Sequence, residues 1–177
     1  MLLPGHLAAG YIVTDTILKT LGDDISSADT KMLLVIGTLA GALPDLDLIS
    51  FFLKNKSLKL QSNESHRTYI SHAPLLWVAA GFVIFLASDS IFYETFGLVL
   101  MCSTLSHFIF DYNEYGIMWL WPFSKKQYSL VKPKIATYPD DRSLGHFYWK
   151  IFTREYLRNK TWYVEIIVIV AALLIYF

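Results

Sequence analysis

Apolar residues gather in five long runs that polar segments separate. The runs cover residues 6–21, 31–52, 73–87, 91–110 and 162–177, and the longest stretch outside them is 112–160. A bilayer core about 30 Å thick needs roughly 20 mostly apolar residues per helix. The pattern therefore predicts an all-α, polytopic membrane protein with about four to five transmembrane helices. The first run is the weakest candidate, because it is short and contains Asp15.

The composition supports a location in lipid. Hydrophobic residues make up 54% of the 177-residue chain and charged residues only 17%, against about 25% charged residues in soluble domains. A soluble all-α protein with long buried helices is the alternative. The formal net charge is zero, so charge gives no reason to expect a nucleic-acid partner. The single Cys102 cannot form an internal disulfide. Length and composition predict one membrane domain over residues 1–177.

Basic residues fall almost entirely on one side of the predicted topology. If the five runs alternate across the bilayer, all but Lys19 and Lys31 of the 15 Lys and Arg residues lie on the same side. Loops rich in Lys and Arg remain in the cytoplasm. The sequence therefore predicts a multi-pass protein whose N-terminus is cytoplasmic and whose C-terminus is outside.

Histidines and carboxylates gather at the cytoplasmic ends of the predicted helices. His6 begins the first helix, the second run contains the pair Asp45 and Asp47 beyond Pro44, His66 and His72 precede the third, and His107 and Asp111 close the fourth. The carboxylates at the opposite ends have no histidine among them. Four helix ends thus bring metal-type ligands to one face, which predicts a shared site facing the cytoplasm.

The spacing of these residues suits metal binding. His107 and Asp111 are four residues apart, so they share a helix face and can chelate one ion. Pro44 disfavours a continuous helix through Leu43, which predicts an irregular turn that directs both Asp45 and Asp47 into a cavity. An ordinary turn with a capping aspartate is the alternative. Imidazole with carboxylate suits zinc first, with manganese or iron as alternatives, as one or two divalent ions.

The polar stretch before the last run contains a further amphipathic pattern. Apolar residues recur at helical spacing between residues 142 and 160, and Lys150, Arg154 and Arg158 alternate with them. This pattern predicts an interfacial helix on anionic lipid, or a helix packed on the protein's own cytoplasmic face. His146 lies among aromatic residues here and is interpreted as interfacial. Residues 1–125 then form the metal-site core, 126–161 a cytoplasmic loop, and 162–177 the C-terminal transmembrane helix.

The motifs resemble those of one known family. Gly5-His6, Leu43-Pro44-Asp45-Leu46-Asp47, His66-Arg67, Ser71-His72 and the segment from His107 to Asp111 are similar to the LexA-binding, inner-membrane-associated hydrolases, over roughly residues 1–125. The resemblance implies a multi-helix fold in the bacterial inner (cytoplasmic) membrane and metal-dependent hydrolysis. The ligand types are also similar to those of zinc-dependent phospholipase C and related nucleases, which is an analogy between sites alone.

These observations predict a hydrolase that cleaves a phosphoester or ester bond of a lipid-like substrate with metal-activated water. Its partners would be membrane lipid and a small amphiphilic substrate. Asp47 would bridge two metal ions or act as general base, and Arg67 would hold a phosphate oxygen. The predicted metal ligands are His6, Asp45, Asp47, His66, His72, His107 and Asp111.

Two other classes of function remain open from the sequence. A membrane scaffold would bind the metal, or use the polar cluster structurally, without catalysis. A metal transporter would need a polar path to the far side, and Asp15 is the one strong candidate for such a step. Membrane di-iron hydroxylases fit less well, because they use about eight histidines and the five of this chain are too few.

Overall fold

The protein is all-helical over the residues that its computed structural model describes, which are 1–21, 25–55, 66–112, 116–130, 157 and 161–177. The side chains of residues 51, 52, 54, 55, 66 and 161 lie outside that description. An isolated antiparallel bridge between Ile117 and Tyr128 closes a loop after the fifth helix. The elements are α1 (Leu3–Leu21), α2 (Ser27–Ala40), η2 (Leu43–Leu46), α3 (Asp47–Asn55), η3 (His66–Thr68), η4 (Ile70–His72), α4 (Pro74–Leu86), α5 (Ile91–Asp111) and α7 (Thr161–Tyr176).

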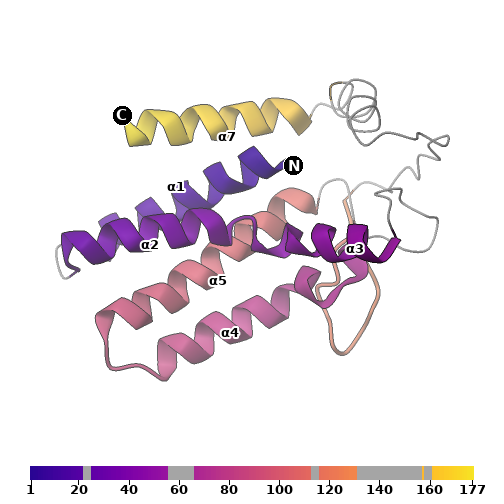
Figure 1. Ribbon diagram of the computed structural model, residues 1–177, viewed down its shortest axis with the longest axis horizontal. Helices are drawn as coiled ribbons and strands as arrows, with labels where there is room; N and C mark the ends of the chain where they lie inside the picture. The colour runs from indigo at the N-terminus through magenta and orange to yellow at the C-terminus, as the bar shows by residue number, and fades with distance from the viewer. Residues whose placement is uncertain (22–24, 56–65, 113–115, 131–156, 158–160) are drawn as a thin grey trace.

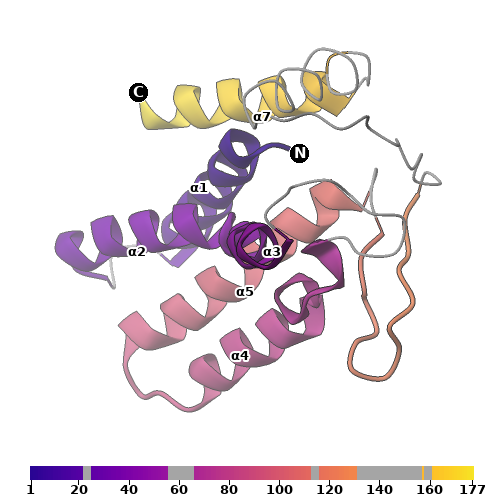
Figure 2. The same cartoon turned by 45° about the vertical axis from the view of Figure 1, so that its right-hand side comes forward.

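Helices α1 and α5 form the middle of the molecule. Helix α1 contacts α2, α5 and α7, and α5 contacts α1, α2 and α4. Figures 1 and 2 show α7 lying along the outer side of α1, and α4 on the outer side of α5. The last apolar run of the sequence therefore packs onto the first.

The second apolar run is not one helix but a bent series. Helix α2 begins at Ser27, inside the polar segment between the first two apolar runs, because Ser26 caps it: the Asp29 backbone N–H donates to Ser26 Oγ at 3.2 Å. Such a cap satisfies a backbone donor that the helix start leaves free. Pro44 lies in the first turn of the short 3-10 helix η2, as its missing N–H and the restriction on Leu43 predict. The axis turns by 56° between Ser27–Ala40 and Leu43–Ser50.

The outer surface is apolar while hydroxyl groups lie inside. Val35 on α2, Val83 on α4 and Leu174 on α7 are all exposed, as are most of their large apolar neighbours on the same faces. Inside, Thr14 and Ser103 are fully buried and their hydroxyls lie 3.2 Å apart. This distribution is typical of helices that pack in lipid, where Ser and Thr occupy helix interfaces.

Glycines allow the helix backbones to approach closely at two crossings. A Cβ at Gly81 of α4 would lie 2.6 Å from the Gly97 carbonyl oxygen of α5, and a Cβ at Gly10 of α1 would lie 2.5 Å from the Gly37 carbonyl oxygen of α2. Close contact through small residues holds membrane helices together by van der Waals packing. The two crossings fix α2 and α4 to the central pair.

No single helix in the described ranges is both long and apolar enough to cross a membrane, although the bent pair of α2 with η2 and the start of α3 passes that test together. The shorter apolar helices are Pro74–Leu86 and Trp162–Tyr176. The multi-pass topology therefore stays a prediction. The predicted interfacial helix at 142–160 and His146 lie outside the described residues.

Candidate metal centre

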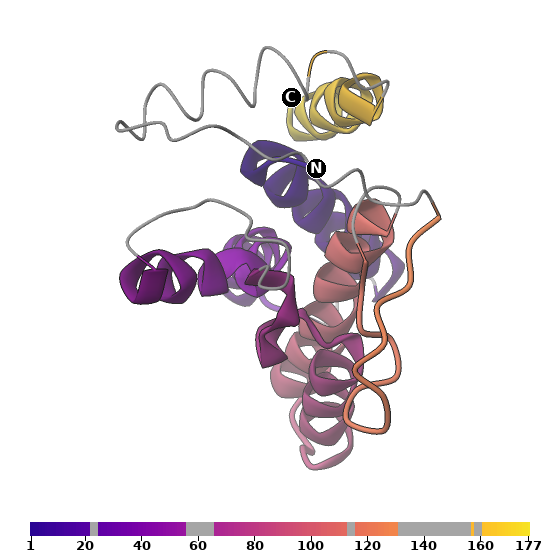
Figure 3. The same ribbon diagram turned by 90° about the vertical axis from the view of Figure 1, so that its right-hand side faces the viewer.

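Four elements deliver histidine and aspartate side chains to one end of the bundle. His6 is in the first turn of α1, Asp45 is in η2, His72 ends η4, and His107 and Asp111 are in the last turns of α5. Figures 1 and 3 show the start of α1, the end of α5 and the η2–α3 segment meeting at this end. The helix ends on which the sequence predicts a cluster of histidines and aspartates therefore meet at one end of the bundle.

Four of these side chains place ligand atoms around one point. Asp45, His72, His107 and Asp111 each offer one oxygen or nitrogen, and these four atoms lie within 4.8 Å of one another. His72 Nε2 is 3.6 Å from Asp45 Oδ1, and His107 Nε2 is 3.7 Å from the same oxygen. His107 Nε2 is also 3.6 Å from Asp111 Oδ2. Two imidazoles and two carboxylates thus share one small volume.

Backbone geometry orients His107. Its Nδ1 lies 3.0 Å from the carbonyl oxygen of Gly41. A carbonyl only accepts hydrogen bonds, so Nδ1 carries the proton and donates. In the neutral imidazole Nε2 then presents a lone pair toward Asp45 and Asp111, and this nitrogen is buried without a hydrogen-bond partner among the described residues.

A carboxylate orients His72 in the same way. Its Nδ1 lies 2.6 Å from Asp47 Oδ2, which also accepts a hydrogen bond from Ser71 Oγ at 2.7 Å. The Trp77 indole N–H donates to the Ser71 carbonyl oxygen at 2.7 Å and fixes the turn before α4. With Nδ1 donating to Asp47, the Nε2 of His72 faces Asp45. An imidazole held by a carboxylate on its far nitrogen is the usual arrangement of metal-binding histidines.

The four-residue cluster fits a divalent cation. A zinc ion with bonds of about 2.0–2.2 Å holds the ligand atoms of a tetrahedron roughly 3.3–3.6 Å apart, close to the three separations above. Lone pairs of imidazole nitrogens and carboxylate oxygens repel one another in a buried site unless a cation or protons lie between them. The side chains of His72, His107 and Asp111 are fully buried, whereas that of Asp45 is 14% exposed. The centre is therefore accessible on the side of η2.

Cationic and aromatic groups surround Asp111 on its other sides. Arg67 Nη2 lies 2.7 Å from Asp111 Oδ2, and the Met1 ammonium lies 3.0 Å from Oδ1. His6 Nε2 is 3.3 Å from the same Oδ1, and the His6 ring stacks on that of His107 with centroids 3.8 Å apart. His6 is fully buried and neither of its ring nitrogens makes a hydrogen bond in the described part of the chain.

The structure places the predicted residues in two groups. Asp45, His72, His107 and Asp111 form the cluster, while His6, Asp47 and Arg67 contact its members from outside. The side chain of His66 lies outside the described residues. Asp47, predicted as a ligand, is outside the four-atom cluster and contacts His72 instead.

Three residues that support the candidate site were not predicted from the sequence. Ser71 precedes His72 and holds Asp47, but nothing in its spacing indicates that role. Gly41 acts through its carbonyl, which no side-chain pattern can reveal. Glu165 of α7 accepts hydrogen bonds from the backbone N–H groups of Leu2 at 3.0 Å and Gly5 at 3.2 Å. The sequence does mark Glu165 as unusual, since it is the only charged residue within the last apolar run.

Comparison with known proteins gives one result. A family model described as YdjM inner membrane protein matches residues 1–177. No curated protein and no solved structure matches the chain.

Proposed function

The chain belongs to the YdjM inner membrane protein family, and on that premise we propose that it is a metal-dependent hydrolase of the membrane. The bond cleaved is a phosphoester or ester bond of a lipid-like substrate. The supporting observation is the convergence of two imidazole Nε2 atoms and two carboxylate oxygens within 4.8 Å in a largely buried site. Ionisable groups at membrane depth are costly, so they are retained mainly for function.

The ligand roles follow from the contacts. Asp45, His72, His107 and Asp111 hold the ion, with zinc as the first choice for this mixture of nitrogen and oxygen ligands. When bound, such an ion acidifies a water molecule and polarises a phosphoryl or carbonyl oxygen. Asp47 holds His72 in its ligating orientation, a role that its 2.6 Å contact with Nδ1 favours over direct ligation.

Arg67 and Asp45 define the side on which a substrate would react. Asp45 is the one member of the cluster with an exposed surface, so water and substrate approach there. Arg67 brings a guanidinium group to the Asp111 edge of the cluster. Guanidinium groups bind phosphate oxygens through paired N–H donors, so Arg67 orients an anionic substrate group in this proposal.

A non-catalytic scaffold is the second candidate, because one observation favours it. Asp111 is already in contact with Arg67, the Met1 ammonium and His6. A carboxylate balanced in this way can tie α1 to α5 without any turnover. Metal binding alone does not separate this candidate from an enzyme, so the test needs both metal content and catalysis.

The first measurement is metal content by elemental mass spectrometry on detergent-purified wild type, His107→Ala and Asp45→Ala. Wild type is expected to bind about one equivalent of a transition metal, or about two if a second ion is present. Both variants are expected to lose most of it. Glu94→Ala, which changes a carboxylate in the first turn of α5 far from the cluster, is the matched control and should keep the metal.

Catalysis is then measured on the same preparations. Wild type reconstituted with zinc or manganese is expected to hydrolyse a short-chain soluble phosphodiester or ester, and phospholipid in mixed micelles. Metal that is lost in both variants, together with no hydrolysis by any reconstituted form, would establish the scaffold. No metal in wild type after reconstitution would rule out the metal-dependent hydrolase and favour a scaffold whose polar cluster is structural.

A further inference from the structure

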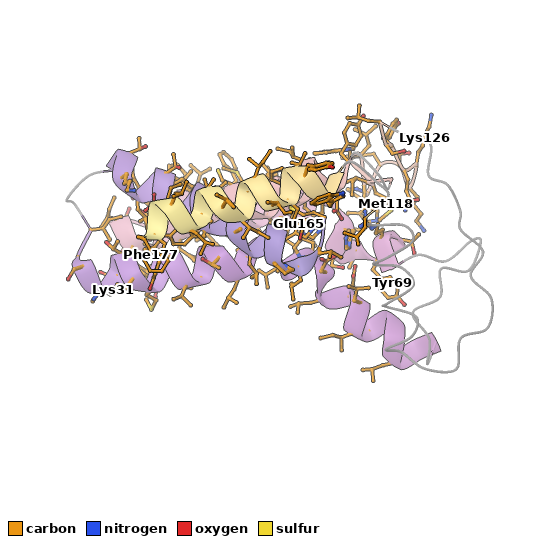
Figure 4. All side chains as sticks on the ribbon, turned by 90° about the horizontal axis from the view of Figure 1, so that it is seen from above. Lys31, Tyr69, Met118, Lys126, Glu165 and Phe177 are labelled. Atoms are coloured by element: carbon orange, nitrogen blue, oxygen red, sulfur yellow. The ribbon has the colours of Figure 1, made fainter. Side chains whose placement is uncertain are left out.

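Helix α3 leaves the bundle next to the metal centre. The chain turns by 56° after α2, and α3 then makes its main contacts with the short helices η2 and η3 rather than with a long helix. Figure 2 shows α3 end-on, and Figure 4 shows it projecting away from the bundle near Tyr69. Its sides are thus largely uncovered by the described helices.

One face of this segment is apolar and exposed. Leu46, Ile49 and Leu53 are 55%, 59% and 70% exposed. They are spaced i, i+3 and i+7, which places them on one side of a helix. Asp47 lies between them in sequence but is 5% exposed and points to His72. The segment therefore presents an apolar stripe outward and a ligand-orienting carboxylate inward.

The surroundings of the stripe indicate what covers it. Met32, Val35 and Leu39 repeat the same spacing on α2 and are exposed as well, so α2 also presents an apolar stripe outward. At the same end of the molecule the loop after α5 exposes Phe123 together with Lys125 and Lys126. Apolar and aromatic side chains with nearby lysines are typical of the boundary between acyl chains and anionic headgroups.

We propose that the face formed by Leu46, Ile49 and Leu53 lies in the membrane, at the boundary between lipid headgroups and acyl chains. The occupant of this face is the lipid bilayer itself, in keeping with the membrane family of the chain. Because Asp45 and Asp47 flank Leu46, the metal centre then lies at headgroup depth. Its accessible side, at Asp45, faces that same boundary.

The consequence for the substrate rests on the proposed function. A lipid would reach the centre by lateral movement within the leaflet, with its acyl chains beside α3 and its headgroup ester at Asp45. A substrate dissolved in the aqueous phase would not need the α3 face. The protein would therefore be specific for lipids that are in the bilayer when they react.

The location of the face is tested without any activity. Ile49→Cys and Leu53→Cys, in a Cys102→Ser background, carry a nitroxide label in vesicles of phosphatidylethanolamine and phosphatidylglycerol. Electron paramagnetic resonance measures collision with oxygen, which concentrates in lipid, and with a water-soluble nickel chelate. Val35→Cys is the lipid-facing reference, and Lys19→Cys, a highly exposed charged position at the other end of the bundle, is the aqueous reference.

Both α3 labels are expected to collide with oxygen as Val35→Cys does, with an oxygen-to-nickel ratio at least about threefold above that of Lys19→Cys. A ratio equal to that of Lys19→Cys would place the face in water and overturn the inference. Labels shielded from both reagents would show that a second copy or another segment of the chain covers α3, which also overturns it.

The substrate consequence is tested with the double variant Ile49→Ser and Leu53→Ser. Hydrolysis of bilayer phospholipid is expected to fall about tenfold or more relative to wild type, while metal content and hydrolysis of a soluble short-chain phosphodiester are retained. Leu86→Ser, at the end of α4, is the control for a polar change on an exposed apolar surface.

An equal fall with both substrates would overturn the specificity for lipids in the bilayer. If wild type hydrolyses neither substrate, the proposed function fails, and the spin-label result still decides where α3 lies.

Discussion

At the scale of single residues, the groups behind the histidines decide what the metal centre can do. Gly41 supplies only a carbonyl oxygen, yet its 3.0 Å contact with Nδ1 determines that Nε2 of His107 faces the two carboxylates. Asp47 does the same for His72. Ligands that are oriented in advance bind a metal more tightly, because less rotamer entropy is lost on binding.

Asp47→Ala is expected to weaken metal affinity by about 10- to 100-fold, since His72 loses the acceptor that orients its ring. Asp47→Asn should lose less, because its amide oxygen can still accept from Nδ1. Competition with a fluorescent zinc indicator measures both. Ser71→Ala is the matched control: it removes one hydrogen bond to Asp47 but leaves the carboxylate on His72. Wild-type affinity in Asp47→Ala would show that Asp47 has no orienting role.

At the scale of helices, two kinds of contact hold the elements that carry the site. Glycine crossings hold α2 to α1 and α4 to α5, and a buried carboxylate attaches α7 to α1. Glu165 is 3% exposed and its two oxygens accept from the backbone N–H groups of Leu2 and Gly5. These donors belong to the helix start that also carries His6, where a negative charge interacts favourably with the helix dipole.

Gly81→Leu is expected to lower the melting temperature in detergent, because its Cβ would lie 2.6 Å from the Gly97 carbonyl oxygen. Overpacking of this kind costs about 1–3 kcal/mol or more. Ala79→Leu enlarges an exposed position on the same helix and should melt close to wild type. Equal melting of the two variants would mean that the α4–α5 crossing can separate to accept a side chain.

Glu165→Ala should destabilise the protein by about 1–3 kcal/mol. The Leu2 backbone N–H loses its acceptor, and the Gly5 N–H keeps only its 3.1 Å contact with the Leu2 carbonyl oxygen. Glu165→Gln keeps one amide oxygen and is expected to lie between the alanine variant and wild type. Thermal unfolding in detergent measures both. An alanine variant as stable as wild type would show that water replaces the carboxylate at no cost.

At the scale of the whole molecule, the apolar outer surface and the one-sided distribution of basic residues both fit one orientation of the bundle in a membrane. Exposed apolar residues cover α2, α4 and α7, and the metal centre is at the end of the bundle that carries Arg67 and Lys126. The positive-inside rule predicts that this end faces the cytoplasm. The orientation is a prediction that can be measured directly in cells.

A membrane-impermeant maleimide is expected to label Asp89→Cys in intact spheroplasts, in a Cys102→Ser background, because the predicted topology places the turn between α4 and α5 on the outer side. Lys126→Cys should be labelled only after the cells are permeabilised. Both positions are exposed in the structure, so a difference reports the side of the membrane rather than burial. Labelling of both positions from the same side would contradict the multi-pass topology.

The sequence predicted what depends on local physics. The apolar runs predicted α1, α4, α5 and α7 to within a few residues, because a run of apolar side chains favours a helix whatever its neighbours are. Pro44 predicted the break after α2, and the four-residue spacing placed His107 and Asp111 on one face. The start of α2 was predicted too late, because the Ser26 cap lies in a segment whose polar composition resembles a turn.

Only the tertiary structure decided how the predicted residues divide their roles. Whether an aspartate ligates a metal or orients a histidine depends on distances of a few ångströms between segments far apart in the chain, such as the 24 and 25 residues from Asp47 to Ser71 and His72. The tautomer of His107 depends on a carbonyl 66 residues away. Such contacts arise from helix packing, which residue spacing along one chain does not encode. The sequence thus determined that metal-type ligands gather at one end, and the fold determined which of their atoms face each other.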